Sequence, residues 1–189
     1  MRYYLVMLGN GFKKLFNASG FTLFEMLVTM SIMSFLAATL IIYSHIGEKQ
    51  IVLFKEQAKV LTVLTRARNL GITSFIKTST STLPCGYGVH FETPGTMIIF
   101  KDTSADSECV LADHRYLGAT SSELFDSVVL DRDVFFSSLT LTDVVFVPPQ
   151  PLVFITPQQD QAIITLTTSS SNPTSASVTV STANQISVQ

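Results

Sequence analysis

The hydrophobic pattern changes twice along the chain. Residues 21–43 are apolar or small hydroxyl residues almost without exception, and Glu25 is their one ionisable side chain. A helix over this stretch would be about 34 Å long at about 1.5 Å per residue, which is enough for the roughly 30 Å hydrocarbon core of a bilayer. The stretch therefore predicts a transmembrane helix.

Two alternatives fit residues 21–43 less well. A cleaved secretory signal has a shorter apolar region of about 7 to 15 residues followed by small residues, whereas residues 39–43 here read Thr-Leu-Ile-Ile-Tyr. A fully buried core helix would need more protein around it than a chain of 189 residues offers. We therefore favour the membrane helix.

The next stretch, residues 47–73, has the spacing of an amphipathic helix with one buried stripe. Its recurring polar positions are Lys55, Glu56, Lys59, Thr62, Arg66, Asn69 and Thr73. The apolar positions expected to form the stripe are Phe54, Ala58, Leu61, Leu64, Ala67 and Leu70. No proline precedes Pro84, so the sequence permits one continuous helix from about residue 21 to about residue 75.

Beyond residue 75 the period shortens to two, serine and threonine become frequent, and all seven prolines occur. The pattern predicts strands at residues 87–91, 96–101, 126–130, 134–136, 143–147, 152–155, 162–167, 176–181 and 185–188. The last two should form a hairpin across Ala183-Asn184. Residues 167–177 should be an exposed loop, and the proline cluster at 148–151 an extended link or an edge.

Composition and charge fit a membrane-anchored, exported protein. Only 14% of the residues are charged, against roughly 25% in an average soluble domain. Residues 1–20 carry Arg2, Lys13 and Lys14 and no acid, so the positive-inside rule predicts that they stay cytoplasmic while the chain after about residue 45 lies outside. Without these three basic residues the net charge falls from -2 to -5.

The segment Gly20-Phe21-Thr22-Leu23-Phe24-Glu25, after a basic leader and before an apolar run, resembles the processing signal of type IV pilins and type II secretion pseudopilins. The resemblance implies that a membrane prepilin peptidase cuts between Gly20 and Phe21 and that the new amine of Phe21 is methylated. Glu25 would then be the fifth residue of the mature protein. Its carboxylate would be stabilised in the membrane by the positive N-terminus of a neighbouring subunit, which couples charge burial to filament register.

The rest of the chain is similar to the H-like subfamily of minor pilins and pseudopilins. The segments that carry this similarity are Arg66-Ala-Arg68, Cys85-Gly-Tyr-Gly-Val-His-Phe91, Phe100-Lys-Asp102, Ile163-Ile-Thr-Leu166 and Val178-Thr-Val180. Subunits of pilus, secretion and competence systems share these features, so the sequence leaves the choice between these systems open. It also leaves open whether the chain is a major or a minor subunit.

Few residues outside the N-terminal segment indicate chemistry. Two cysteines, Cys85 and Cys109, are too few for a structural zinc site. Because export would place them in an oxidising compartment, we favour a disulfide between them over two buried thiols. His45, His90 and His114 are scattered, and His90 should face outward because it alternates with Val89 and Phe91.

We expect neither an enzyme nor a bound metal or cofactor. Asp131-Arg-Asp133 resembles part of a calcium loop, but a solvated turn explains it equally well. The basic residues after Thr73 are dispersed among more numerous acids, which argues against nucleic-acid binding.

The sequence thus predicts an α+β, pilin-like protein in which a long N-terminal helix packs on an antiparallel β-sheet domain. Residues 1–20 would be a cleaved leader, 21–45 a transmembrane and assembly helix, 46–75 an amphipathic helix, and 76–189 an extracytoplasmic head. The predicted function is that of a filament subunit in the bacterial inner membrane. Its expected partners are prepilin peptidase, other subunits, an assembly platform and lipid. The alternative is a solitary anchored binding or adhesin-like ectodomain that never polymerises.

Overall fold

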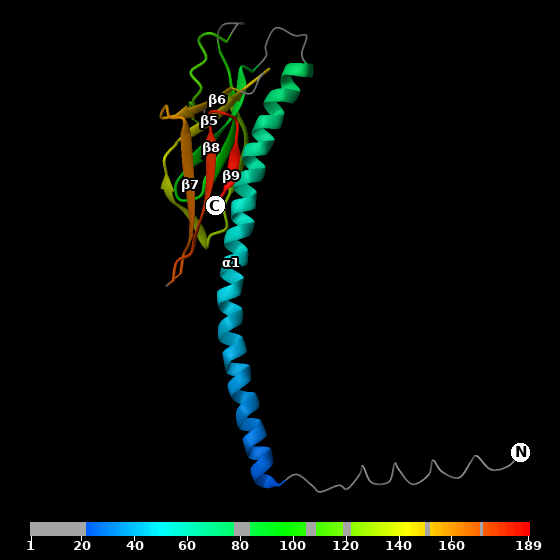
Figure 1. Cartoon of the computed structure of the whole chain (residues 1–189). Helices are drawn as coiled ribbons and strands as arrows, with labels where there is room; N and C mark the ends of the chain where they lie inside the picture. Colours follow the sequence, from blue (N-terminus) through cyan, green and yellow to red (C-terminus); the bar gives the residue numbers. More distant parts are fainter. Residues whose placement is uncertain (1–21, 78–83, 105–108, 119–121, 150–151, 171) are drawn as a thin grey trace, which may run out of the picture. The chain divides into compact units, whose positions relative to one another are not determined.

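The computed structural model describes residues 22–77, 84–104, 109–118, 122–149, 152–170 and 172–189 (Figure 1). The side chains of residues 42, 45, 46 and 75–77 lie outside this description. The chain divides into two units, Met1–His45 and Ile46–Gln189.

One helix, α1 (Leu23–Lys77), runs through the first unit and into the second, which confirms the predicted continuous helix. No proline interrupts its 55 residues. The part in the first unit is exposed on all sides, while the part in the second unit has a buried side. The helix therefore gains a buried side where its sequence changes from uniformly apolar to amphipathic.

All nine predicted strands are present, with ends that differ by a few residues. They are β1 (Gly86–Glu92), β2 (Thr96–Asp102), β3 (Leu124–Val129), β4 (Val134–Leu139), β5 (Asp143–Val147), β6 (Leu152–Thr156), β7 (Gln161–Thr168), β8 (Ser175–Ser181) and β9 (Ile186–Val188). They form a five-stranded sheet in the order β3-β2-β1-β5-β6 and a four-stranded sheet in the order β4-β7-β8-β9. Every pairing is antiparallel, and the fold is α+β as predicted.

A single hydrophobic core joins α1 and the two sheets of the second unit. Alternate residues of β1, β2, β5 and β6 meet alternate residues of β7 and β8, with the C-terminal half of α1 packed against them (Figure 1). The rings of Phe91 on β1 and Phe136 on β4 meet edge to face at 5.8 Å and so link the sheets.

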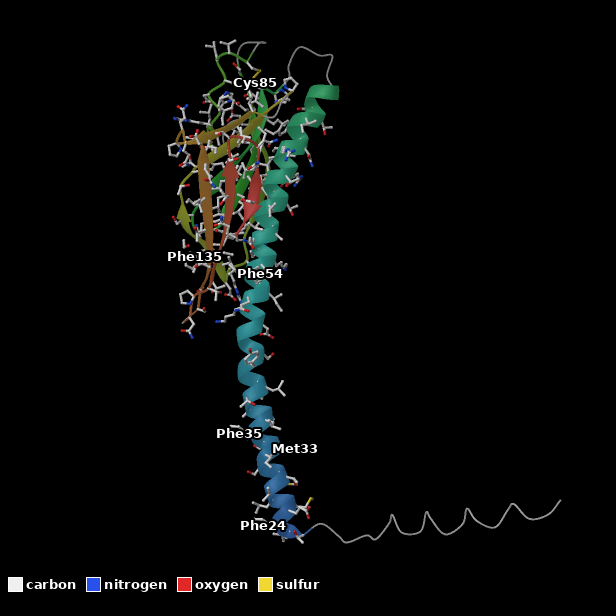
Figure 2. The ribbon with its side chains drawn as sticks, viewed as in Figure 1. Phe24, Met33, Phe35, Phe54, Cys85 and Phe135 are labelled. Carbon is white, nitrogen blue, oxygen red and sulfur yellow. A yellow bond between two sulfur atoms is a disulfide. The ribbon has the colours of Figure 1, made fainter. Side chains whose placement is uncertain are left out.

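The buried stripe of α1 differs from the predicted one. Leu64 and Ala67 are buried as expected, but Phe54 is 62% exposed and Ala58 is exposed as well (Figure 2). The observed stripe is formed by Leu53, Glu56, Gln57, Val60, Val63, Leu64, Ala67 and Gly71. Periodicity correctly located an amphipathic helix, but the predicted buried stripe is centred about one residue too far along the chain. The reason is that several apolar residues lie on each side of this helix.

Glu56 belongs to that stripe although it was assigned to the polar face. Its side chain is 1% exposed, and one carboxylate oxygen accepts a hydrogen bond from the backbone N–H of Asp131 at 3.1 Å. The same oxygen pairs with the ammonium group of Lys59, which also donates to the Val129 carbonyl at 3.3 Å. A buried carboxylate is retained here because it has these partners.

One loop prediction needs new bounds, and the terminal hairpin is confirmed. β7 and β8 pair as a hairpin, but Thr167 and Thr168 are buried in β7 and Ala176 is buried in β8, so the exposed loop is shorter than residues 167–177. At the proline cluster the edge is confirmed, because β6, which follows it and pairs with β5, is an edge strand. Residues 150 and 151 of the cluster lie outside the described residues. Asn184 has φ of 62° in the β8–β9 turn.

Candidate functional site

The start of α1 is fixed by a local cap. The Thr22 hydroxyl oxygen accepts a hydrogen bond from the backbone N–H of Glu25 at 3.3 Å, and the Thr22 carbonyl accepts one from the N–H of Met26 at 3.1 Å. The spacing Thr-x-x-Glu is that of a capping box, and a carboxylate in the first turn also complements the helix dipole. Thr22 therefore caps α1, which we did not predict although the spacing is visible in the sequence.

The helix that follows presents apolar side chains in all directions. Phe24, Met33 and Phe35 are 74%, 73% and 70% exposed, and Figure 2 shows Met33 on the opposite side of the helix from Phe24 and Phe35. In the described part of the chain, Leu23–Ile41 is the one segment long and apolar enough to cross a membrane, and none of it is buried in the protein. Glu25 is exposed within this surface.

Residues 15–41 match the family model of the prokaryotic N-terminal methylation motif. This chain carries a prepilin-type methylation motif. The match supports the type IV pilin and pseudopilin family and a pilin-like, processed subunit, and it points to a structural protein rather than an enzyme. No curated protein and no solved structure matched the chain. The match ends at residue 41, so the similarity of the head to the H-like subfamily stays a prediction.

The motif and the exposed apolar helix together indicate membrane anchoring. Gly20 and Phe21, the two residues of the predicted scissile bond, lie outside the described residues. Glu25 lies in the first turn of α1. Within the described chain its carboxylate has no ion-pair partner, and its predicted partner is the N-terminal amine of another subunit.

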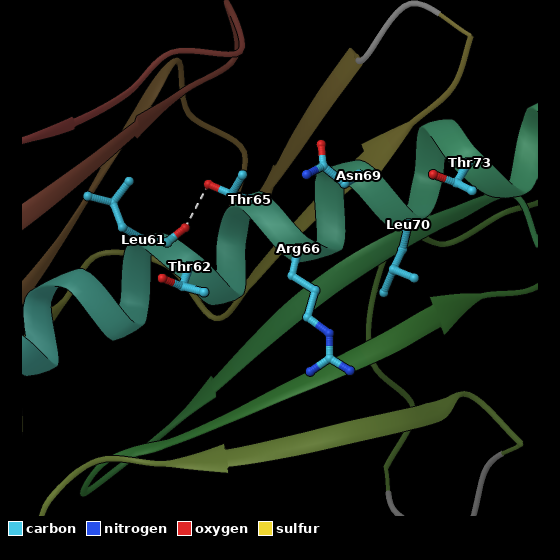
Figure 3. Close-up of a pocket in the computed structure, with 7 residues that line it drawn as sticks. All are labelled: Leu61, Thr62, Thr65, Arg66, Asn69, Leu70 and Thr73. Atoms are coloured by element: carbon cyan, nitrogen blue, oxygen red, sulfur yellow. Dashed lines mark hydrogen bonds between the residues drawn. The ribbon is translucent and has the colours of Figure 1, made fainter.

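A shallow pocket of about 540 Å³ lies along one side of α1 in the second unit (Figure 3). It is lined by Leu61, Thr62, Thr65, Arg66, Asn69, Leu70 and Thr73. The one charged group among them, the Arg66 guanidinium, is paired with the Asp126 carboxylate at 2.5 Å and lies 5.9 Å from the centre of the Phe125 ring. Because Arg66 is already paired, this pocket has no spare charge with which to hold an anionic ligand.

His90 and His114 each contact a buried aspartate. Nδ1 of His90 lies 2.8 Å from Oδ1 of Asp143, and Nδ1 of His114 lies 2.6 Å from Oδ2 of Asp102. His90 points to the opposite side of β1 from Val89 and Phe91, as the alternation predicts. On that side its ring lies 5.2 Å from the Tyr116 ring, and its side chain is 20% exposed. The side chain of His45 lies outside the described residues.

The remaining candidates are structural in this fold. Cys85 and Cys109 form a disulfide with a Cα–Cα distance of 5.5 Å. Asp131 and Asp133 lie in the turn between β3 and β4, where Oδ1 of Asp131 accepts the N–H of Asp133 at 3.1 Å. Among the described residues no three of His, Cys, Asp and Glu lie close enough to hold a metal ion.

Proposed function

We propose that this chain is a structural subunit, a minor pilin or pseudopilin, of a type IV pilus-like or type II secretion filament. Prepilin peptidase cuts it after Gly20, and Phe21 becomes the N-methylated first residue. The observation that carries the proposal is the methylation motif at residues 15–41, followed directly by an exposed apolar helix with a single carboxylate.

The physical argument rests on Glu25. An ionised carboxylate in hydrocarbon costs at least a few kcal/mol, and such residues are retained where a partner stabilises them. After cleavage at Gly20 the methylated amine of Phe21 on a neighbouring subunit is a cation that can lie in the same layer as Glu25. Assembly then removes the cost of burying Glu25, so only subunits in the correct axial register are favoured.

The proposed topology and partners follow from the same segment. The basic leader stays on the cytoplasmic side of the bacterial inner membrane, where the peptidase acts, and the head lies in the periplasm or outside the cell. The apolar helix contacts lipid before assembly and other subunits afterwards. Extraction of the subunit from the membrane is the task of an inner-membrane assembly platform.

The experiment is Glu25→Val in the bacterium that makes the protein, with Thr29→Val as the matched control. Thr29 lies in the same apolar helix, and its hydroxyl donates only to the Met26 carbonyl within its own turn, at 3.0 Å. Both variants should remain membrane-bound and processed. Glu25→Val should lower the amount of subunit in the sheared filament fraction by at least about tenfold, because 1.4 kcal/mol corresponds to a factor of ten.

Normal filaments or secretion with Glu25→Val in the membrane would contradict the assembly role. That result would favour the solitary anchored ectodomain, in which Glu25 only complements the helix dipole in the first turn of α1.

A further inference from the structure

The two sheets of the second unit have four edges, formed by β3 and β6 in the five-stranded sheet and by β4 and β9 in the four-stranded sheet. An edge strand carries backbone N–H and C=O groups that no neighbouring strand pairs, so it can bind a strand of another chain. Proteins protect such edges with charged side chains, bulges, very short strands or a covering element. Three of the four edges here are protected in one of these ways.

The edge of β3 is protected by side chains. The N–H of Ser127, which faces away from β2, is bonded to the carboxylate of its neighbour Asp126 at 2.8 Å. The carbonyl of Val129 accepts a hydrogen bond from the ammonium group of Lys59 on α1 at 3.3 Å. A register shift also interrupts the pairing of β3 with β2.

The edges of β4 and β9 are protected as well. β4 has an irregular register opposite β7, and its Phe136 N–H donates to the carbonyl of Pro94 at 2.8 Å. β9 is only three residues long and lies beside α1, whose Gln57 side chain donates to the Gln189 carbonyl at 3.2 Å (Figure 1). β6 is the exception.

β6 turns the backbone groups of Val153 and Ile155 toward its free edge. On the other side of β5, the Phe91 N–H donates to the Thr142 carbonyl at 2.9 Å, so by the alternation of an antiparallel ladder residues 143, 145 and 147 face β6. Their partners on β6 are residues 156, 154 and 152. The N–H and C=O groups of Val153 and Ile155, which lie between these partners, therefore point away from β5. Within the described chain no hydrogen bond reaches them.

β6 lacks the protection that the other edges have. Its register with β5 is regular, and no ionisable residue lies between Asp143 and Asp160 in the sequence. On the outer face of the sheet, opposite the hydrophobic core, Leu152 and Phe154 are 58% and 40% exposed. The side chains of the two residues with free backbone groups lie in the core. The edge is thus open along its backbone and apolar on both faces.

Prolines limit the length of this open edge. Positions 151 and 157, which flank the strand, are both proline, and proline has no N–H to donate. We call Leu152–Thr156 the β6 window. A strand bound there would take its hydrogen bonds from Val153 and Ile155, so the window suits a short segment.

A second copy of this chain does not suit the window. Two identical edge strands pair antiparallel around a two-fold axis perpendicular to the sheet, and this rotation reverses every direction in the sheet plane. The second half of α1 runs alongside the sheets, so the two copies would have antiparallel helices (Figure 1). Their Ile46 ends would then point in opposite directions, which does not suit two chains anchored in the same membrane.

We propose that the β6 window binds a short, extended and uncharged segment of a different protein, which adds to the five-stranded sheet as a sixth, antiparallel strand. Main-chain hydrogen bonds to Val153 and Ile155 hold the segment, and its alternate side chains supply specificity. The residue beside Phe154 is apolar, because this ring is stacked on that of His114 with 4.0 Å between centroids. A charge there would lose hydration without gaining a partner. This inference does not depend on filament assembly.

Hydrogen exchange measured by mass spectrometry on the full, oxidised chain in detergent micelles tests the window. The probe is a synthetic, end-capped peptide of alternating threonine and valine, and the control peptide has lysine in place of each valine. With about 1 mM probe the exchange of the free amides of Val153 and Ile155 should slow at least about twofold, since binding raises protection by 1 + [L]/Kd. The control peptide should not slow it.

Leu152→Lys places a charge in the window, and Leu117→Lys changes a residue of similar exposure outside the sheets. The probe should slow exchange in Leu117→Lys but not in Leu152→Lys. No slowing in the unmodified chain would overturn the proposal, and so would equal slowing by the lysine peptide. Protection of residues 152–156 without any probe, together with a dimer in sedimentation, would show that a second copy occupies the window instead. If Leu152→Lys does not fold, the two peptides decide on the unmodified chain.

Discussion

Gly88 of β1 faces the outer side of the five-stranded sheet at a point where the Phe100 ring occupies the space of a side chain. A Cβ at Gly88 would lie 2.5 Å from Cζ of Phe100 and 2.9 Å from the backbone oxygen of Val144. The glycine therefore leaves room for the Phe100 ring, which on this face lies 5.5 Å from the Tyr116 ring. The sequence showed Gly88 only as part of a motif, because Phe100 lies on the neighbouring strand.

We expect Gly88→Ala to lower the free energy of unfolding by about 2 kcal/mol, because the ring and a backbone oxygen must both shift. Gly47→Ala is the control, since no atom lies within 4 Å of its would-be Cβ. That change in the helix should leave the stability unchanged or raise it by up to about 1 kcal/mol. Denaturant unfolding of the two variants, followed by far-ultraviolet circular dichroism, measures the difference. Equal stabilities would show that Phe100 does not need the space.

The histidines illustrate what residue-level reasoning can predict. Alternation along β1 correctly placed His90 on the side opposite Val89. It could not show that this side is covered, because the Tyr116 ring, which lies 5.2 Å from that of His90, comes from the connection between β2 and β3. One local signal was overlooked: β2 is apolar at Ile98 and Phe100 as well as at Met97 and Ile99, which indicates a strand buried on both faces.

At the scale of elements, the strands were the most predictable part of the fold. Their period of two and the turn residues between them are local properties, and all nine were found. The pairing order β3-β2-β1-β5-β6 depends on contacts between distant segments and was not predicted. The stripe of α1 was misplaced for the same reason, because Glu56 is held at its buried position by the β3–β4 turn as well as by Lys59 of the same helix.

Glu56 should be the polar residue that fixes α1 to this turn. Glu56→Ala removes the acceptor for the Asp131 N–H at a buried position, so the free energy of unfolding should fall by about 2 kcal/mol. Glu56→Gln keeps an acceptor oxygen and should lose less. Lys55→Ala, an exposed neighbour, should change the stability by less than about 0.5 kcal/mol. Chemical unfolding of the three variants gives the ranking. Glu56→Ala as stable as Lys55→Ala would mean that the turn is held by its apolar neighbours alone.

At the scale of the whole molecule, the sequence combines an apolar N-terminal helix with a head built from two sheets and the amphipathic half of the same helix. The segment proposed for assembly was predictable because it is short and contiguous: a glycine, one carboxylate and an apolar run. The packing of residues 109–118 on the five-stranded sheet was not, because it depends on residues from four strands that meet only in the fold.

The account as a whole depends on processing between Gly20 and Phe21. The most direct measurement is the intact mass and N-terminal peptide mass of the protein isolated from the membrane of the bacterium that makes it. We predict a chain that begins at Phe21 and carries one methyl group on its N-terminal amine. A chain that retains residues 1–20 and begins at Met1 would contradict the proposal that this protein is a processed filament subunit.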